Sequence, residues 1–344
     1  MITYNNSKLL RAVAMLIVMV SHYATWMYVP VTNEALRYRI SNWGPFGVDI
    51  FFMLSGYGLY ISASKCKRMG LSFLIKRLID VYIPYLFMVF VIMLINGEWK
   101  GISLSGVADY LTGVNYWYIN VLLIFYIMFS LVWWIFTDDR IRIALILVGV
   151  AGLSFVFHRL GRNDFWVVSN MTFVIGIIAA FLEKEWKHGI AKRTEGDSQH
   201  ITRKRTQIIT SVIVALAGGI GFAVTDICYW EIQRENPLGG FGCKCLMNVL
   251  FALLILGCAY MYSILTENRK VGRISGIFGI IGKYSLYIYV MHTVLFWTML
   301  PWFIKLGFIA ASVLVAVLSI VVSCLCGFAF NKYVCSKLER ILIS

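Results

Sequence analysis

The chain alternates between long apolar runs and short polar breaks. The runs are continuous rather than alternating in polarity, so they predict helices and not strands. A helix of about 20 apolar residues spans the hydrocarbon core of a bilayer. The pattern predicts an all-α, polytopic integral membrane protein with about ten transmembrane helices. We place them at residues 8–29, 45–64, 73–95, 117–137, 141–157, 165–182, 207–224, 244–265, 276–299 and 305–330.

Charged or Pro/Gly-rich breaks separate these runs. We expect a single membrane-embedded domain over residues 1–344. The first apolar run has no small-residue cleavage pattern, so it predicts a retained helix and not a signal peptide. The clearest breaks are residues 30–44, 65–70, 97–113, 183–204 and 226–242.

Composition agrees with a membrane protein. The chain is 60% hydrophobic and 14% charged, which leaves too little polar surface to cover a water-soluble domain. None of its eight cysteines forms a CxxC pair, so we expect no metal centre. Cys228, Cys243 and Cys245 lie in or just after one break. The sequence allows either a disulfide between Cys228 and one of the other two or free thiols.

The net charge of +14 fits cytoplasmic loops better than a nucleic-acid partner, because basic residues collect on the inner side of membranes. If the N-terminus is cytoplasmic, 23 of the 31 lysines and arginines fall on that side and eight on the other. This bias predicts that both termini are cytoplasmic. The most polar segment, residues 183–206, is interpreted as a basic cytoplasmic loop that is either a solvated linker or a contact for anionic lipid or a cofactor.

Ionisable residues inside a span are costly and usually face a cavity or a partner. Arg11 and His22 lie 11 residues apart in the first run, so on a helix they share one face and are separated by about 16 Å. Arg11 is then a cation near the cytoplasmic end and His22 a titratable base deeper in the membrane. The alternatives are an end-anchoring arginine and a histidine that bonds a neighbouring helix.

Two later segments also place polar groups in apolar helices. Asp49 lies near the start of the second run, where it either caps the helix or has an active role. His292 lies within the ninth run, and Tyr289 and Ser285 share its helix face. Packing against a neighbouring helix is the competing explanation for this group.

These segments together resemble the acyltransferase-3 family of membrane O-acyltransferases. The family's first helix has an arginine and a histidine separated by ten residues, as Arg11 and His22 are. Its second helix reads Gly-Val-x-x-Phe-Phe-x-Leu-Ser-Gly-aromatic, which matches Gly47 to Tyr57. The residues from Phe73 to Tyr85 resemble its basic helix start followed by proline, except that Asp80 replaces a basic residue. The Trp117-Tyr118 pair and the segment from Ser285 to His292 resemble its fourth and late helices. We expect no extracytoplasmic hydrolase-like domain of the kind that is frequent in this family.

The resemblance implies transfer of an acyl group, most often acetyl, from cytoplasmic acyl-CoA to a hydroxyl of a cell-surface polysaccharide or lipid-linked sugar. Acyl-CoA, the glycan acceptor and membrane lipids are then the partners, and acetyl-CoA is a co-substrate rather than a bound cofactor. His22 is the expected base, because a neutral imidazole suits that task near pH 7, and Asp49 is the acid that orients it.

The same resemblance assigns the remaining candidates. Arg11 and Arg77 are expected to bind the donor, since guanidinium groups suit phosphates and carbonyls. The acceptor side, or its structural support, is assigned to Ser55, Trp117, Tyr118, Tyr289 and His292. Competing functions are a transporter or flippase that uses His22, Asp49 and Arg11 as a polar relay, a membrane scaffold or receptor, and an acyltransferase that acts on a small molecule.

Overall fold

The protein is helical throughout the part that the structure describes. The computed structural model describes residues 2–26, 34–65, 71–97, 100–191, 198–266 and 273–342. It is 92% helical, and these ranges contain no strand. Ten helices within them are long and apolar enough to cross a membrane. This confirms the predicted all-α, multi-pass architecture.

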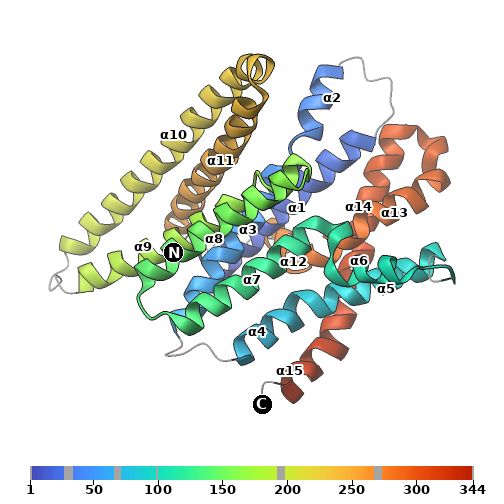
Figure 1. Cartoon of the computed structure of the whole chain (residues 1–344), viewed down its shortest axis with the longest axis horizontal. Coiled ribbons are helices and arrows are strands. Elements are labelled where there is room, and N and C mark those ends of the chain that lie inside the picture. The colour runs from blue at the N-terminus through green and yellow to red at the C-terminus, as the bar shows by residue number, and fades with distance from the viewer. Residues whose placement is uncertain are drawn as a thin grey trace. The chain divides into compact units, whose positions relative to one another are not determined.

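Figure 1 shows the order of the helices. Two short π-helical segments, η1 and η6, interrupt the regular pattern, and such bulges are frequent at functional sites. The α-helices and these two segments are α1 (Tyr4–Trp26), α2 (Glu34–Ser41), α3 (Gly44–Ala63), α4 (Leu71–Arg77), η1 (Leu78–Tyr82), α5 (Ile83–Asn96), α6 (Leu104–Thr112), α7 (Trp117–Ile135), α8 (Asp139–Arg159), α9 (Asn170–Ala191), α10 (Ser198–Glu235), α11 (Pro237–Leu265), α12 (Arg273–Lys283), α13 (Ser285–Phe303), α14 (Phe308–Phe330), η6 (Asn331–Cys335) and α15 (Ser336–Leu342).

Two predicted breaks are shorter than expected. The break at residues 226–242 is helical except at Asn236, whose side chain accepts a hydrogen bond from the Gly239 N–H and starts α11, with Pro237 in its first turn. An asparagine cap followed by proline therefore replaces a loop by a one-residue turn. The expected basic loop at 183–206 is also largely helical, because α9 extends to Ala191 and α10 begins at Ser198; residues 192–197 lie outside the described ranges.

A third difference concerns the predicted span at 276–299. That stretch consists of two helices, because α12 ends at Lys283 and α13 begins at Ser285. Two other breaks contain short helices, namely α2 and α6. The polar composition of those segments predicted an interruption of the span but did not exclude a short helix lying within the interruption.

The chain divides into two compact units. Unit 1 comprises residues 1–10, 45–68 and 135–275, and unit 2 comprises residues 11–44, 69–134 and 276–344. Each unit combines segments that are distant in sequence. The single domain expected over 1–344 stays a prediction.

Glycines allow close helix packing inside unit 1. A Cβ atom at Gly56 would overlap the carbonyl oxygen of Phe173, and one at Gly176 would overlap the carbonyl oxygen of Met53. These are backbone contacts between α3 and α9 in both directions. Small residues are what allow two membrane helices to approach this closely. Gly56 and Gly176 therefore have a packing role between these two helices.

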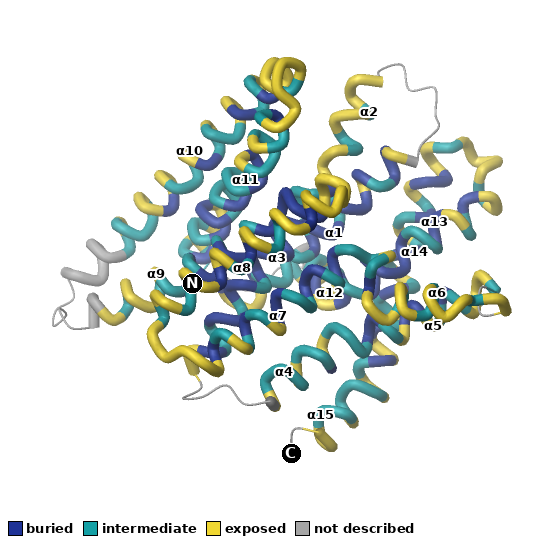
Figure 2. The backbone as a smooth tube through the Cα atoms, viewed as in Figure 1, coloured by how far each residue is buried: buried dark blue, intermediate teal, exposed yellow. Residues whose placement is uncertain are grey.

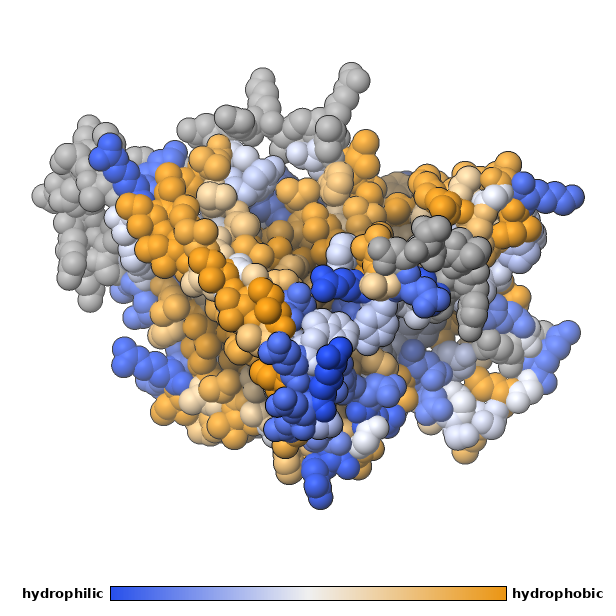
Figure 3. Space-filling model, turned by 90° about the horizontal axis from the view of Figure 1, so that it is seen from above, coloured by the Kyte–Doolittle hydropathy of each residue, from blue (hydrophilic) through white to orange (hydrophobic). Residues whose placement is uncertain are grey.

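Helices α10 and α11 form a hairpin within unit 1 (Figure 1). The buried positions Ser211, Gly218 and Thr225 recur every seven residues along α10, the spacing of a coiled-coil seam. The rest of α10 is mostly exposed or half-buried (Figure 2). Its exposed apolar residues, such as Ile213 and Ile220, suit lipid contact. Broad apolar areas also cover the face displayed in Figure 3.

Unit 2 is organised around α13, which packs against α14 and α5. A Cβ at Gly327 of α14 would overlap the rings of Tyr284 and Tyr287. The Tyr287 hydroxyl lies 2.6 Å from Oδ1 of Asn331, at the start of η6. The Cys335 thiol of η6 lies 3.8 Å from the carbonyl oxygen of Ile79 in η1. The two π-helical segments thus contact each other through this thiol.

Candidate active site

Two histidines meet inside unit 2. His22, on α1, and His292, on α13, lie with Nδ1 of His22 2.8 Å from Nε2 of His292. Their ring planes differ by only 4°, and the ring centroids are 5.1 Å apart. His292 is buried, with 1% of its surface exposed, whereas His22 is partly exposed. The structure therefore joins the base predicted on the first span to a residue predicted for the acceptor side or its structural support.

The rings are joined edge to edge and not face to face. For parallel rings, a centroid distance of 5.1 Å is close to the largest that a 2.8 Å contact between two ring nitrogens allows. That limit is reached when both nitrogens lie on the line between the ring centres. An in-plane lone pair then points directly at the N–H of the other ring, which is good hydrogen-bond geometry.

Aromatic side chains surround the histidine pair. The ring of Tyr23 contacts Phe296 at 4.3 Å between centroids and lies 6.5 Å from the ring of His292. Tyr289 lies one turn before His292, with their centroids 6.2 Å apart. These neighbours are buried. They provide a largely apolar setting in which the few polar groups interact more strongly than in water.

A row of contacting tyrosines extends from Tyr289 away from the histidine pair, within unit 2. Tyr118 packs edge-on against Tyr289 at 5.2 Å, and Tyr116 does so at 6.4 Å. Tyr85 in turn packs edge-on against Tyr116 at 5.6 Å. The predicted residues Tyr118 and Tyr289 are therefore in contact, while Trp117 is partly buried beside Tyr118. Tyr85 and Tyr116 belong to this track as well, although the sequence pattern did not single them out as site residues.

A charged cluster lies in another part of unit 2. Arg77 forms an ion pair with Asp80 at 3.8 Å, with both side chains partly exposed. Asp80 also interacts electrostatically with Lys76 and Arg11. The two arginines predicted to bind the donor thus share one carboxylate neighbour. Asp80, which replaces the basic residue usual in the family pattern, lies in η1. Its negative charge partly neutralises this cluster.

Asp49 is fully buried in α3, within unit 1. Its carboxylate interacts with the hydroxyl of Ser169. The Ser169 hydroxyl, which is another buried polar group of this unit, contacts the Pro45 carbonyl at 3.2 Å and Oδ1 of Asn248 at 3.5 Å. Asp49 is inside the helix and not at its cap position. Its proposed action on His22 stays a prediction.

Sequence reasoning missed a second carboxylate of unit 1, that of Glu183, which is partly buried. One Glu183 oxygen accepts hydrogen bonds from the hydroxyls of Tyr57 and Tyr260, at 2.7 and 2.8 Å. The other pairs with Lys187 at 2.8 Å. Tyr57 ends the motif on α3 that the sequence highlighted, so a polar partner was to be expected for its hydroxyl. Ser55, two residues earlier, is partly buried.

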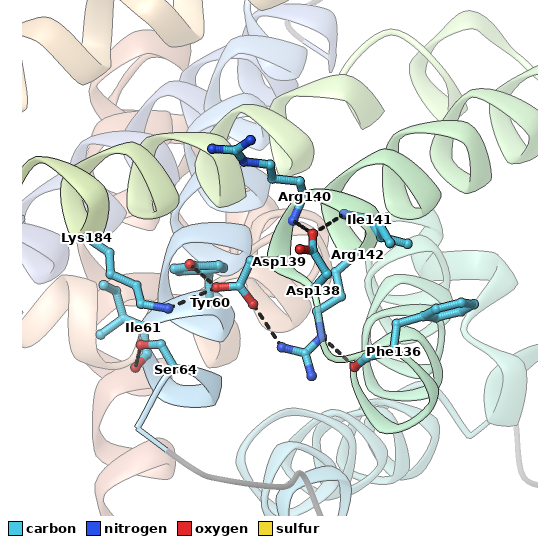
Figure 4. A network of polar contacts seen from close by, with 10 residues as sticks. All are labelled: Tyr60, Ile61, Ser64, Phe136, Asp138, Asp139, Arg140, Ile141, Arg142 and Lys184. Carbon is cyan, nitrogen blue, oxygen red and sulfur yellow. Dashed lines mark hydrogen bonds and ion pairs between the residues drawn. The ribbon is translucent and has the colours of Figure 1, made fainter. Parts of the chain in front are cut away.

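Figure 4 shows a third polar network, also within unit 1. Asp139 at the start of α8 accepts hydrogen bonds from Tyr60, Lys184 and Arg142, at 2.7, 2.9 and 2.9 Å. Asp138 caps the same helix by accepting from two backbone N–H groups. Residues from α3, α8 and α9 therefore converge on one carboxylate. The charges of Lys184 and Arg142 are thus paired with Asp139, as expected of a structural network.

The cysteines near the α10–α11 turn are not bridged. Cys228, Cys243 and Cys245 are free thiols in the structure. Among the described residues, no group of three or more histidine, cysteine or acidic side chains is arranged to hold a metal ion. Cys66 lies outside the described ranges.

The fold and the site define a multi-pass membrane protein with a histidine pair inside one of its units. A family model described as "Acyltransferase domain" of the acyltransferase-3 type matches residues 4–331. The chain therefore belongs to the acyltransferase-3 family and is a membrane acyltransferase. The match contains every candidate site residue and confirms the resemblance. Searches of the curated proteins and of the solved structures found no match.

Proposed function

We propose that the protein moves an acyl group, most simply acetyl, from cytoplasmic acyl-CoA to a hydroxyl of a cell-surface polysaccharide or lipid-linked sugar. The observation that carries this proposal is the 2.8 Å contact between His22 and His292 in a chain of an acyltransferase family. Both termini are placed in the cytoplasm, as the distribution of basic residues predicts.

The net reaction needs one proton transfer and one exchange of bonds at the acyl carbon. The hydroxyl oxygen of the acceptor forms the ester bond, the carbon–sulfur bond of the thioester breaks, and the sulfur of CoA receives the proton. An alcohol is a weak nucleophile until a base takes its proton. His22 is the proposed base, because it is the partly exposed member of the pair.

The charged cluster of unit 2 supports a role in donor binding. Acyl-CoA carries several phosphate charges, and guanidinium groups bind phosphates by paired hydrogen bonds. Arg11 and Arg77, which both interact with Asp80, are the proposed donor-binding residues. Tyr118 and Tyr289 are proposed for the acceptor side, where their aromatic faces suit a sugar ring, and Trp117 and Ser55 for the same side or its support.

Transfer of radiolabel from acetyl-CoA tests this proposal. Inside-out membrane vesicles with and without the protein are given acetyl-CoA labelled in the acetyl group, and the envelope glycans and lipid-linked sugars are then separated. We expect alkali-labile label in one of these fractions only when the protein is present. If several acyl-CoA donors label no glycan but a small hydroxyl compound is acylated, the acceptor class is wrong. If nothing is acylated, the polar-relay transporter replaces the enzyme.

A further inference from the structure

The hydrogen bonds of His292 determine which of its nitrogens is protonated. Its Nδ1 lies 2.8 Å from the carbonyl oxygen of Tyr289 and 3.0 Å from that of Ile288. A carbonyl oxygen only accepts hydrogen bonds, so Nδ1 of His292 must hold the proton. His292 is buried, and an unpaired charge there is costly. In the neutral ring, Nε2 is then the acceptor.

This assignment passes from His292 to His22. Because Nε2 of His292 accepts, the Nδ1 atom of His22 that lies 2.8 Å away must donate. Nδ1 of His22 is therefore protonated, and its Nε2 holds the lone pair. The edge-to-edge arrangement of the rings, with 4° between their planes, places the donor and the acceptor lone pair in line.

We propose that His292 is a positioning residue which, anchored by the carbonyls of Ile288 and Tyr289, holds His22 in the tautomer whose Nε2 can accept a proton. This inference rests on the proposed function, in which His22 takes the hydroxyl proton. When Nε2 of His22 accepts that proton, its Nδ1–H still donates to His292, now as a charge-assisted and stronger hydrogen bond. His292 thereby stabilises the imidazolium without itself becoming protonated.

The difference in exposure between the two histidines fits these two roles. The partly exposed ring is that of His22 and the fully buried ring is that of His292. A group that exchanges protons with a substrate must be reached by it, whereas a group that fixes a tautomer is best held rigidly. Two backbone acceptors on its own helix and the Tyr23 ring 6.5 Å away hold His292.

Nitrogen-15 NMR of the whole protein in nanodiscs tests the tautomers without any assay of transfer. The chain has five histidines, so the signals of His22 and His292 are assigned by comparison with His22→Gln and His292→Gln. We expect a protonated Nδ1 and an unprotonated Nε2 on both rings near neutral pH. A His22 ring protonated at Nε2 alone would overturn the inference, even if transfer by the protein is established.

Kinetics of two substitutions test the consequence for catalysis. His292→Gln keeps an oxygen that accepts from Nδ1 of His22, whereas His292→Leu has no acceptor. We expect His292→Leu to lose about 100-fold or more in kcat, the usual contribution of a well-placed general base, with little change in the KM for acyl-CoA. His292→Gln should recover a substantial part of that loss.

His158→Leu is the matched control. His158 is an exposed residue of unit 1 whose ring stacks on Phe241. This substitution should leave kcat unchanged. Equal activity of His292→Leu and wild type would overturn the positioning role. If His292→Leu does not fold, the tautomer measured in the wild type and the activity of His292→Gln still decide the question. Absence of transfer by the wild type would instead contradict the proposed function.

Discussion

A carboxylate that is fully buried is expensive, and Asp49 is such a group. The Ser169 hydroxyl interacts with it, but one neutral donor does not replace the water that an ionised carboxylate loses on burial. An ionisable residue at that cost inside a membrane span is a candidate for a functional role.

The first prediction follows for Asp49→Asn, which keeps the shape and removes the charge. The substituted protein should be at least as stable as the wild type, because the desolvation cost falls. Its acyl transfer should drop by about 100-fold or more if the carboxylate takes part in the reaction. Thermal unfolding in detergent and transfer rates are measured on the same preparation. Full activity of a stable Asp49→Asn protein would remove Asp49 from the proposed site.

The second prediction concerns Asp80, the carboxylate that interacts with both arginines proposed to bind the donor. Asp80 pairs with Arg77 and interacts with Arg11, so Asp80→Asn should free positive charge for an anionic donor. We expect the KM for acyl-CoA to fall by a few-fold in Asp80→Asn. In Arg77→Ala the KM should rise by about 10-fold, which corresponds to the loss of one charge-assisted hydrogen bond. Steady-state kinetics at low and moderate salt measure both. An unchanged KM in Arg77→Ala would exclude this cluster from donor binding.

At the residue scale, the sequence selected both histidines as candidates but did not predict their contact. The ionisable character of His22 and His292 inside apolar runs was sufficient to select them, because such groups are rare in membranes. That they touch depends on how α1 and α13 pack, and helical periodicity within one span contains no information about its neighbours. The same limit explains why Glu183 was not recognised as the partner of Tyr57.

At the scale of elements, the glycine contacts between α3 and α9 provide a matched pair of substitutions. The third prediction is that Gly56→Ala destabilises the protein by about 1–3 kcal/mol, because the new Cβ overlaps the backbone carbonyl of Phe173. Gly58→Ala, two residues later, meets nothing within 4 Å and should be neutral or slightly stabilising. Unfolding of the two variants in detergent measures the difference. Equal stability would show that α3 and α9 do not pack through Gly56.

Elements were predicted well where apolar runs end abruptly and poorly where a cap connects two helices. The expected span 45–64 corresponds to α3, and 117–137 to α7, within one or two residues. The stretch 226–242 was read as a break because it is polar, but the Asn236 cap and Pro237 let two helices meet there. Polarity indicates where a chain leaves the membrane, and does not indicate where its helix ends.

At the scale of the whole molecule, the distribution of basic residues predicts its orientation. The fourth prediction is that Ser64→Cys, at the exposed end of α3, faces the cytoplasm, and that Ser105→Cys, exposed on α6, faces outward. A membrane-impermeant maleimide should therefore label Ser105→Cys in intact cells and Ser64→Cys only after permeabilisation. Labelling of the wild type gives the background from the native thiols. The reverse pattern would invert the topology and place the donor on the wrong side.

The family match at residues 4–331 assigns the reaction class, and the structure adds a site within one unit. Composition alone predicted a membrane protein, since a chain with 60% hydrophobic residues has too little polar surface for an ordinary water-soluble domain. The proposal that His22 is the base came from the resemblance. Its contact with His292 came from the structure, because only packing brings residues 22 and 292 together.

The fifth prediction concerns the central claim, that His22 takes the acceptor proton. It is tested most directly by the transfer rate of purified His22→Ala in lipid, compared with that of the wild type at equal amounts of folded protein. We expect His22→Ala to bind acyl-CoA with nearly unchanged affinity and to lose about 100-fold or more in kcat. A folded His22→Ala protein that transfers acyl groups at the wild-type rate would contradict the account.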